Sequence, residues 1–145
     1  MSEQKETDDG RVLLVPCSGI GKAFGSVGRE AAYVVVEELR PEETGTVCLA
    51  RLTLPDDEES RRLVGEHKTI AIDGCPKACA RISIEQAGGT PSATFRVFDV
   101  FRAHKELRAQ GVSDIGDNGR ELARILAEEI AAKVDELLGK QSEEK

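Results

Sequence analysis

The sequence predicts a single α/β domain of three layers, in which a mainly parallel, four-stranded, doubly wound sheet has helices on both faces. Short apolar runs alternate with segments of helical periodicity along the whole chain, which is typical of βαβ units. The length of 145 residues suits one domain, and no internal repeat or linker divides it. Because right-handed crossovers leave few arrangements of such strands, we expect the strand order 2-1-3-4.

The first half of the chain contains two predicted strand–helix pairs. Residues 12–15 (VLLV) are short and apolar enough for a buried strand, which Pro16 ends. Apolar residues then recur every three or four positions over 24–39, the spacing of one buried helix face. A second strand is expected over 46–50. The next helix is expected over 55–67, since proline followed by acidic residues suits a first helical turn.

The second half continues the alternation. Residues 69–73 (TIAID) predict a third strand, and 77–86 predict a helix that two glycines close. Residues 94–101 are rich in Phe and Val and predict the fourth strand. A short helix is expected over 104–110, and the clearest helix follows over 120–138, where one stripe of Leu, Ile and Val recurs.

Both ends are expected to lie outside this domain, which spans 11–139. Residues 1–10 predict a disordered acidic tail without the apolar region of a secretory signal, and residues 140–145 predict a frayed tail. No segment approaches the ~20 apolar residues that a membrane span needs. We therefore expect a cytoplasmic protein, and thiols are kept reduced in that compartment.

The net charge of −7 bears on possible partners. Binding to nucleic acid needs a basic surface that displaces counterions, and docking on anionic lipid needs one too. We therefore expect neither nucleic acid nor a membrane as a partner, and solubility is the simplest interpretation of the acidity. The protein partner and the oligomeric state stay open at this point.

The four cysteines, Cys17, Cys48, Cys75 and Cys79, are predicted to form one thiolate site. Three of them follow the first, second and third strands, which are neighbours about 4.8 Å apart in the expected order. The carboxyl edge of such a sheet, at its switch point, is where ligands bind. If Cys75 begins a helix, Cys79 shares its face one turn later. We expect Zn²⁺, which is tetrahedral and binds Cys sulfur at ~2.3 Å.

The segment around Cys75 resembles a known family. Residues 71–80 (AIDGCPKACA) are similar to the central motif of the DGC domain family, which is named for this Asp-Gly-Cys triplet. Residues 17–19 and 48–50 resemble the other two cysteine motifs of the family, in the same order. The resemblance spans about 12–100 and implies zinc chelation by the four cysteines. Residues 51–54 (RLTL) differ from the more glycine-rich segment that the family has after this motif. The difference affects the expected shape of that loop, and Cys48 remains an expected ligand.

Three functions remain open. The first is a metal-binding protein without catalysis, whose zinc is structural or sensory, because a four-cysteine shell has no open coordination position. The second is a thiol redox or sulfur-transfer enzyme that uses Cys75 and Cys79, since a helix N-terminus at Cys75 favours the thiolate. The third is an iron–sulfur protein, because four thiolates hold a cluster as well as they hold zinc.

Other residues have weaker interpretations. Residues 19–25 (GIGKAFG) match nucleotide-binding loops only in part, and a turn near the metal is the simpler interpretation. Asp73 is expected to form a turn by bonding its own backbone, or else to act as a hydrogen-bond acceptor behind the ligands or as a general base. Lys77 and Arg81 could balance the charge of the thiolates, and His67 is expected on the surface.

Overall fold

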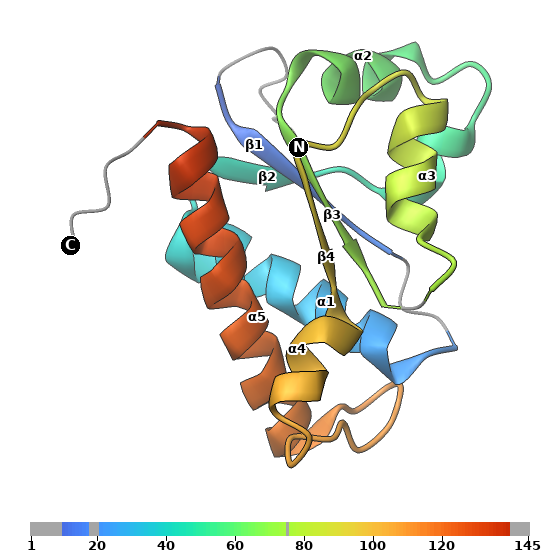
Figure 1. Cartoon of the computed structure of the whole chain (residues 1–145). Coiled ribbons are helices and arrows are strands. Elements are labelled where there is room, and N and C mark those ends of the chain that lie inside the picture. Colours follow the sequence, from blue (N-terminus) through green and yellow to red (C-terminus); the bar gives the residue numbers. More distant parts are fainter. Residues whose placement is uncertain (1–9, 18–20, 75, 140–145) are drawn as a thin grey trace.

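The computed structural model describes residues 10–17, 21–74 and 76–139, and it has the predicted α/β architecture (Figure 1). Within these residues, four strands pair in parallel in the order β2-β1-β3-β4. The strands are β1 (Val12–Pro16), β2 (Thr44–Thr46), β3 (Thr69–Asp73) and β4 (Ala93–Arg96). The predicted order 2-1-3-4 is confirmed.

Helices cover both faces of the sheet and give the molecule three layers (Figure 1). On one face lie α1 (Ala23–Val34) with its π-helical extension η1 (Val35–Leu39), α4 (Val97–Ala103) and α5 (Gly116–Leu137). On the other face lie the 3₁₀ helix η2 (Leu49–Thr53), α2 (Glu58–Glu66) and α3 (Cys79–Gln86).

The central strand β1 shows why the sheet lies in the middle. Val12 and Leu14 pack into the core beneath α1, α4 and α5, whereas Leu13 and Val15 pack into the core beneath η2, α2 and α3. Successive side chains of a strand point to opposite faces. A parallel strand covered on both faces is therefore apolar at every position, which is what the run 12–15 predicted.

Strand β2 begins and ends earlier than predicted. It was expected over 46–50 but covers Thr44–Thr46, where Thr44 pairs with Val12. Val47 donates one more hydrogen bond to the Leu14 carbonyl, at 3.3 Å, before the chain turns into η2. Cys48 thus lies beyond the strand, immediately before this 3₁₀ helix.

The region after β4 corrects two further predictions. The fourth strand was expected to continue to Phe101 but ends at Arg96, and the chain continues directly as α4. Val97, Val100 and Phe101 are buried at helical spacing, whereas Phe98 is 48% exposed. A helical period was therefore mistaken for a strand rich in Phe and Val. Residues 104–110, expected as a helix, form a turn followed by irregular chain.

Helix α5 starts at Gly116, four residues before its predicted start at Arg120. The Asp114 side chain accepts a hydrogen bond from the Gly116 amide at 3.0 Å, which stabilises this earlier start. Its far end is held by Arg40, which donates two hydrogen bonds of 2.8 and 2.7 Å to the Asp135 carboxylate. This pair raises the pKa of Arg40 above its usual range.

His67 was expected on the surface, and this prediction is wrong. The residue is only 8% exposed, and its ring nitrogen Nδ1 lies 3.0 Å from the Leu63 carbonyl oxygen at the end of α2. The predicted tails over 1–10 and 140–145 lie, apart from Gly10, outside the described residues. None of the described helices has the length and apolar character needed to cross a bilayer.

Candidate metal centre

The structure places three of the four predicted ligands at one edge of the sheet. Cys17 follows β1 directly, and its amide donates a 2.9 Å hydrogen bond to the Ile72 carbonyl of β3. Cys48 lies two residues after β2, and Cys79 is the first residue of α3, the helix that follows β3. Because β2, β1 and β3 are parallel neighbours, all three cysteines follow carboxyl ends at the same edge. Cys75 lies outside the described residues.

The elements that carry Cys48 and Cys79 also touch each other. Helix η2, which begins after Cys48, packs against α3, which begins at Cys79. Both thiols are exposed, and Cys17 is partly buried. Since an apolar run surrounds Cys48, the simplest alternative was a buried core residue, and its exposure argues against that alternative.

The described residues do not contain a preformed metal cluster. Within 10–17, 21–74 and 76–139, no three side chains of His, Cys, Asp or Glu are grouped closely enough to hold a metal ion. The structure therefore brings together the chain segments that carry Cys17, Cys48 and Cys79, but it does not gather their sulfur atoms. The four-cysteine shell stays a prediction.

Asp73 has a different role from the expected local turn. Its carboxylate accepts hydrogen bonds from the amide of Ala80 at 2.8 Å and from the amide of Arg81 at 3.3 Å. These amides are among the first of α3 and have no partner within the helix. Asp73 is only 3% exposed, so the last residue of β3 anchors the start of α3 inside the protein. The carboxylate also complements the positive end of the helix dipole.

Ala78 adds a conformational constraint immediately before Cys79. Its φ and ψ angles are 56° and 46°, and no other non-glycine residue in the described part of the chain has a positive φ. An L-residue in this left-handed region costs about 1–2 kcal/mol. Such outliers persist only where surrounding structure over-determines the backbone, and they concentrate at functional sites.

The observed start of α3 corrects its predicted bounds. The helix was expected over 77–86 but begins at Cys79, and residues 76 and 77 form a turn before it. The free amides of that N-terminus are already bound by Asp73. Arg81 is about half exposed and pairs with Glu85 at 3.2 Å.

Two other predicted features lie close to this edge. Lys77 is exposed, and no ion pair connects it to the described residues. The glycine-rich segment 19–25 lies partly outside the description, which resumes at Gly21, a residue with a φ of 92°. Neither observation assigns a nucleotide to the loop.

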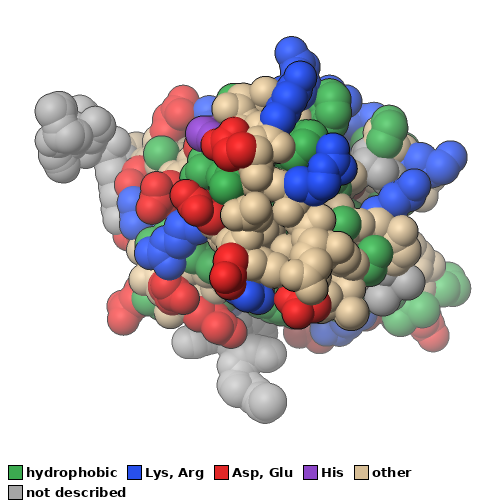
Figure 2. All heavy atoms as spheres, turned by 90° about the horizontal axis from the view of Figure 1, so that it is seen from below, with side chains coloured by type: hydrophobic (Ala, Val, Ile, Leu, Met, Phe, Trp, Pro, Cys, Tyr) green, Lys and Arg blue, Asp and Glu red, His purple; other side chains and the backbone are tan. Residues whose placement is uncertain are grey.

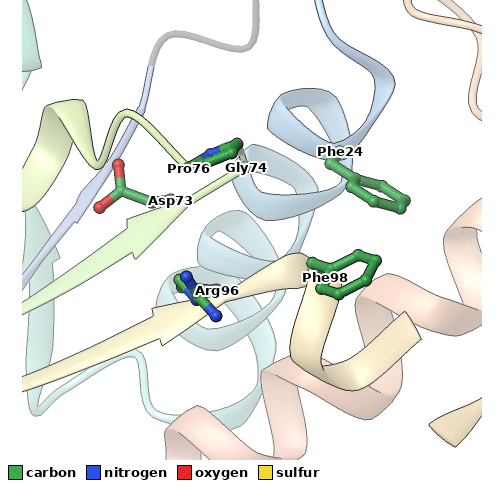
Figure 3. Close-up of a pocket in the computed structure, with 6 residues that line it drawn as sticks. All are labelled: Phe24, Asp73, Gly74, Pro76, Arg96 and Phe98. Carbon is green, nitrogen blue, oxygen red and sulfur yellow. The ribbon is translucent and has the colours of Figure 1, made fainter. Parts of the chain in front are cut away.

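Sequence analysis missed a cavity of about 240 Å³ beside the Asp-Gly-Cys motif (Figure 3). It lies between the start of α1, the turn after β3 and the junction of β4 with α4. The residues that line it are Phe24, Asp73, Gly74, Pro76, Arg96 and Phe98. The sequence predicted a strand at Phe98 and therefore gave no indication of this cavity. The observed helix α4 places the Phe98 ring at the cavity instead.

Comparison with known families gives one match. A model of the DGC domain matches residues 13–118, which is well over half of the chain and contains all four cysteine positions. No curated protein and no solved structure is significantly similar to the chain. By its sequence match over the strands that carry the cysteine motifs, this protein belongs to the DGC domain family.

Proposed function

We propose that this protein binds one Zn²⁺ ion through the thiolates of Cys17, Cys48, Cys75 and Cys79. The observation that carries the proposal is the position of the described cysteines after three adjacent, parallel strands. Cys75 follows β3 by two residues in the sequence. Membership of the DGC domain family supports the same four positions.

The donor atoms suit zinc. Thiolate sulfur is a preferred ligand of Zn²⁺, and four cysteines complete a tetrahedral shell without water. Cys48 and Cys79 are exposed, so a metal ion can reach them. Because a closed shell leaves no position for substrate, the proposed zinc links chain segments or senses thiol oxidation rather than hydrolysing a substrate.

The segment between Asp73 and Cys79 supports a site that is built rather than accidental. Asp73 holds the first turn of α3, and Ala78 adopts a costly left-handed conformation next to Cys79. Both features fix the backbone at the start of α3, where Cys79 lies. The thiol-enzyme alternative is not favoured, because the carboxylate of Asp73 already occupies the amides that would stabilise a thiolate.

Elemental analysis of anaerobically purified protein tests the proposal. We expect about one zinc ion per chain, loss of this zinc in each of the four Cys→Ser variants, and full retention in a His104→Asn control. Substitution by Co²⁺ should give the sulfur-to-cobalt charge-transfer absorption of a thiolate site, because the metal is bound through sulfur.

Two results would contradict the zinc site. Zinc content that survives Cys48→Ser and Cys79→Ser would show that the metal is held elsewhere. A brown protein that contains iron and inorganic sulfide would replace zinc by an iron–sulfur cluster. We further propose a cytoplasmic protein without nucleic-acid or membrane partners, in keeping with the net charge of −7.

A further inference from the structure

The cavity beside the Asp-Gly-Cys motif has apolar walls, and the half-exposed side chain of Arg96 lies at its edge. Phe24 and Phe98 form one side, with ring centroids 6.4 Å apart, and Gly74 and Pro76 lie opposite (Figure 3). Phe24 is held from behind by Phe101, whose ring centroid lies 5.2 Å away. The site is therefore walled by a packed aromatic pair.

Two charged residues line the cavity, and Arg96 is more accessible to a ligand than Asp73. Asp73 lines it, but its carboxylate points away from the Phe rings and is bound to the α3 amides (Figure 3). Arg96, at the end of β4, makes one contact with Asp99 at 3.3 Å, in which both side chains are about half exposed, 53% and 52%. A guanidinium has five N–H donors, so this weak surface pair leaves several for a ligand.

The size of the cavity limits the ligand. A volume of about 240 Å³ is equivalent to about eight water molecules at roughly 30 Å³ each, which suits a molecule of about ten non-hydrogen atoms. An aromatic ring suits walls made of Phe side chains, because offset and edge-to-face ring contacts are favourable. A carboxylate suits the planar guanidinium of Arg96.

The end of the molecule toward which β3 and β4 run is not uniformly acidic, although the net charge is −7. Figure 2 shows the end of the molecule toward which β3 and β4 run, and Lys and Arg side chains gather along its upper and right margins. Asp and Glu side chains lie mainly at the left and below in the same view. This separation of charge allows an anion to approach an acidic protein from one side.

From these observations we propose that the cavity binds a small aromatic carboxylate, with the ring against Phe24 and Phe98 and the carboxylate on Arg96. None of the described lining residues is a cysteine, although Gly74 and Pro76 flank the proposed ligand Cys75 in the sequence. The exposed ring of Phe98, 48% accessible at the start of α4, is then a binding surface rather than a misplaced core residue.

Titration of the ¹⁵N-labelled full chain with benzoate tests this site. We expect millimolar binding, with the largest amide shifts at residues 96–98 and at Phe24. Benzamide, which has the same shape without the charge, should bind at least about tenfold more weakly, because hydrogen bonds to charged groups are the stronger ones. Arg96→Gln and Phe98→Ala should each weaken benzoate binding by about tenfold.

Arg102→Gln is the matched control. Arg102 lies on α4, the helix that carries Phe98. Its guanidinium carbon is 5.8 Å from the Phe98 ring centroid and it approaches Asp99, but it does not line the cavity. We expect the benzoate affinity of the Arg102→Gln variant to differ from that of the wild type by less than about twofold. Because Arg96 and Phe98 are about half exposed, the test variants should remain folded, which circular dichroism checks.

The outcomes separate this proposal from the zinc proposal. Benzoate binding that persists after zinc removal supports the cavity whether or not the metal site is correct. Binding that disappears with the zinc but survives Arg96→Gln would mean that the carboxylate coordinates the metal, and it would overturn the role of Arg96. Equal affinity for benzoate and benzamide, or shifts confined to other residues, would also overturn it.

Discussion

The backbone of Gly74 lies against the backbone of Gly25, so closely that a Cβ atom on Gly74 would be 2.4 Å from the Gly25 nitrogen and 2.6 Å from its Cα. Real Cβ atoms do not approach backbone atoms this closely. The turn after β3 and the first turn of α1 therefore touch through main-chain atoms. This contact explains why glycine follows Asp73 in the motif.

Replacing Gly74 by Ala should destabilise the protein by about 1–3 kcal/mol or more, because backbone atoms cannot move aside as a flexible side chain can. Urea unfolding measures the change. Gly65→Ala is the matched control, since Gly65 lies within α2 and a Cβ there meets nothing within 4 Å. That substitution should be neutral or stabilise by up to about 1 kcal/mol through helix propensity. Similar stabilities of the two variants would contradict the close contact.

Asp73→Ala should lower the free energy of unfolding by about 2 kcal/mol, the upper range for loss of a helix cap, because the amides of Ala80 and Arg81 lose a buried acceptor. Hydrogen exchange at these two amides should accelerate more than exchange in the sheet. Asp56→Ala is the control, since Asp56 is exposed and is bonded to none of the described residues. Unchanged exchange at Ala80 in Asp73→Ala would rule out this capping role.

The left-handed backbone at Ala78 predicts opposite effects of two substitutions. Ala78→Gly should leave stability unchanged or raise it by up to about 1 kcal/mol, because glycine adopts positive φ without a Cβ clash. Ala78→Val should lower stability by about 1 kcal/mol or more, since β-branched residues strongly resist this conformation. Thermal unfolding of both variants decides the matter, and a more stable Val variant would be inconsistent with the observed backbone.

The interactions of Asp57 at the start of α2 predict a small loss of stability at acidic pH. The Arg51 guanidinium, at 2.7 Å, and the Ser60 amide hold the pKa of Asp57 below its ordinary value of 3.8. A carboxyl group whose pKa falls on folding stabilises the protein above its unfolded pKa, and this contribution disappears as the pH drops through the folded value. The stability difference between wild type and Asp57→Asn should therefore shrink as the pH falls below about 4. Urea titrations over this range measure it, and a constant difference would count against the interaction.

Removal of zinc should lower the melting temperature without unfolding the domain. A ligand at one hundred times its Kd stabilises the folded state by about 2.7 kcal/mol, and chelation removes this contribution. Two apolar cores on the two faces of the sheet do not involve Cys17, Cys48 or Cys79, the cysteines that the structure describes, so circular dichroism should still show a folded protein. An unchanged melting curve after metal analysis confirms zinc loss would exclude a structural role for the ion.

The sequence alone was enough to predict the sheet and the edge at which Cys17, Cys48 and Cys79 lie. The apolar runs of β1 and β3 and the stripe of α5 are local patterns, and alternation with right-handed crossovers left the order that the structure has. Cys17 and Cys48 follow strands in the sequence, so their common edge followed from parallel pairing alone.

Tertiary structure alone decided the details of the site. The segment 97–103 contains residues that suit either a strand or a helix, and only burial of Val97, Val100 and Phe101 against the core selected the helix that places Phe98 at the cavity. The cap by Asp73 and the contact of Gly74 with Gly25 join residues 7 or more positions apart. Local periodicity cannot report such contacts, because they depend on how separate elements pack in three dimensions.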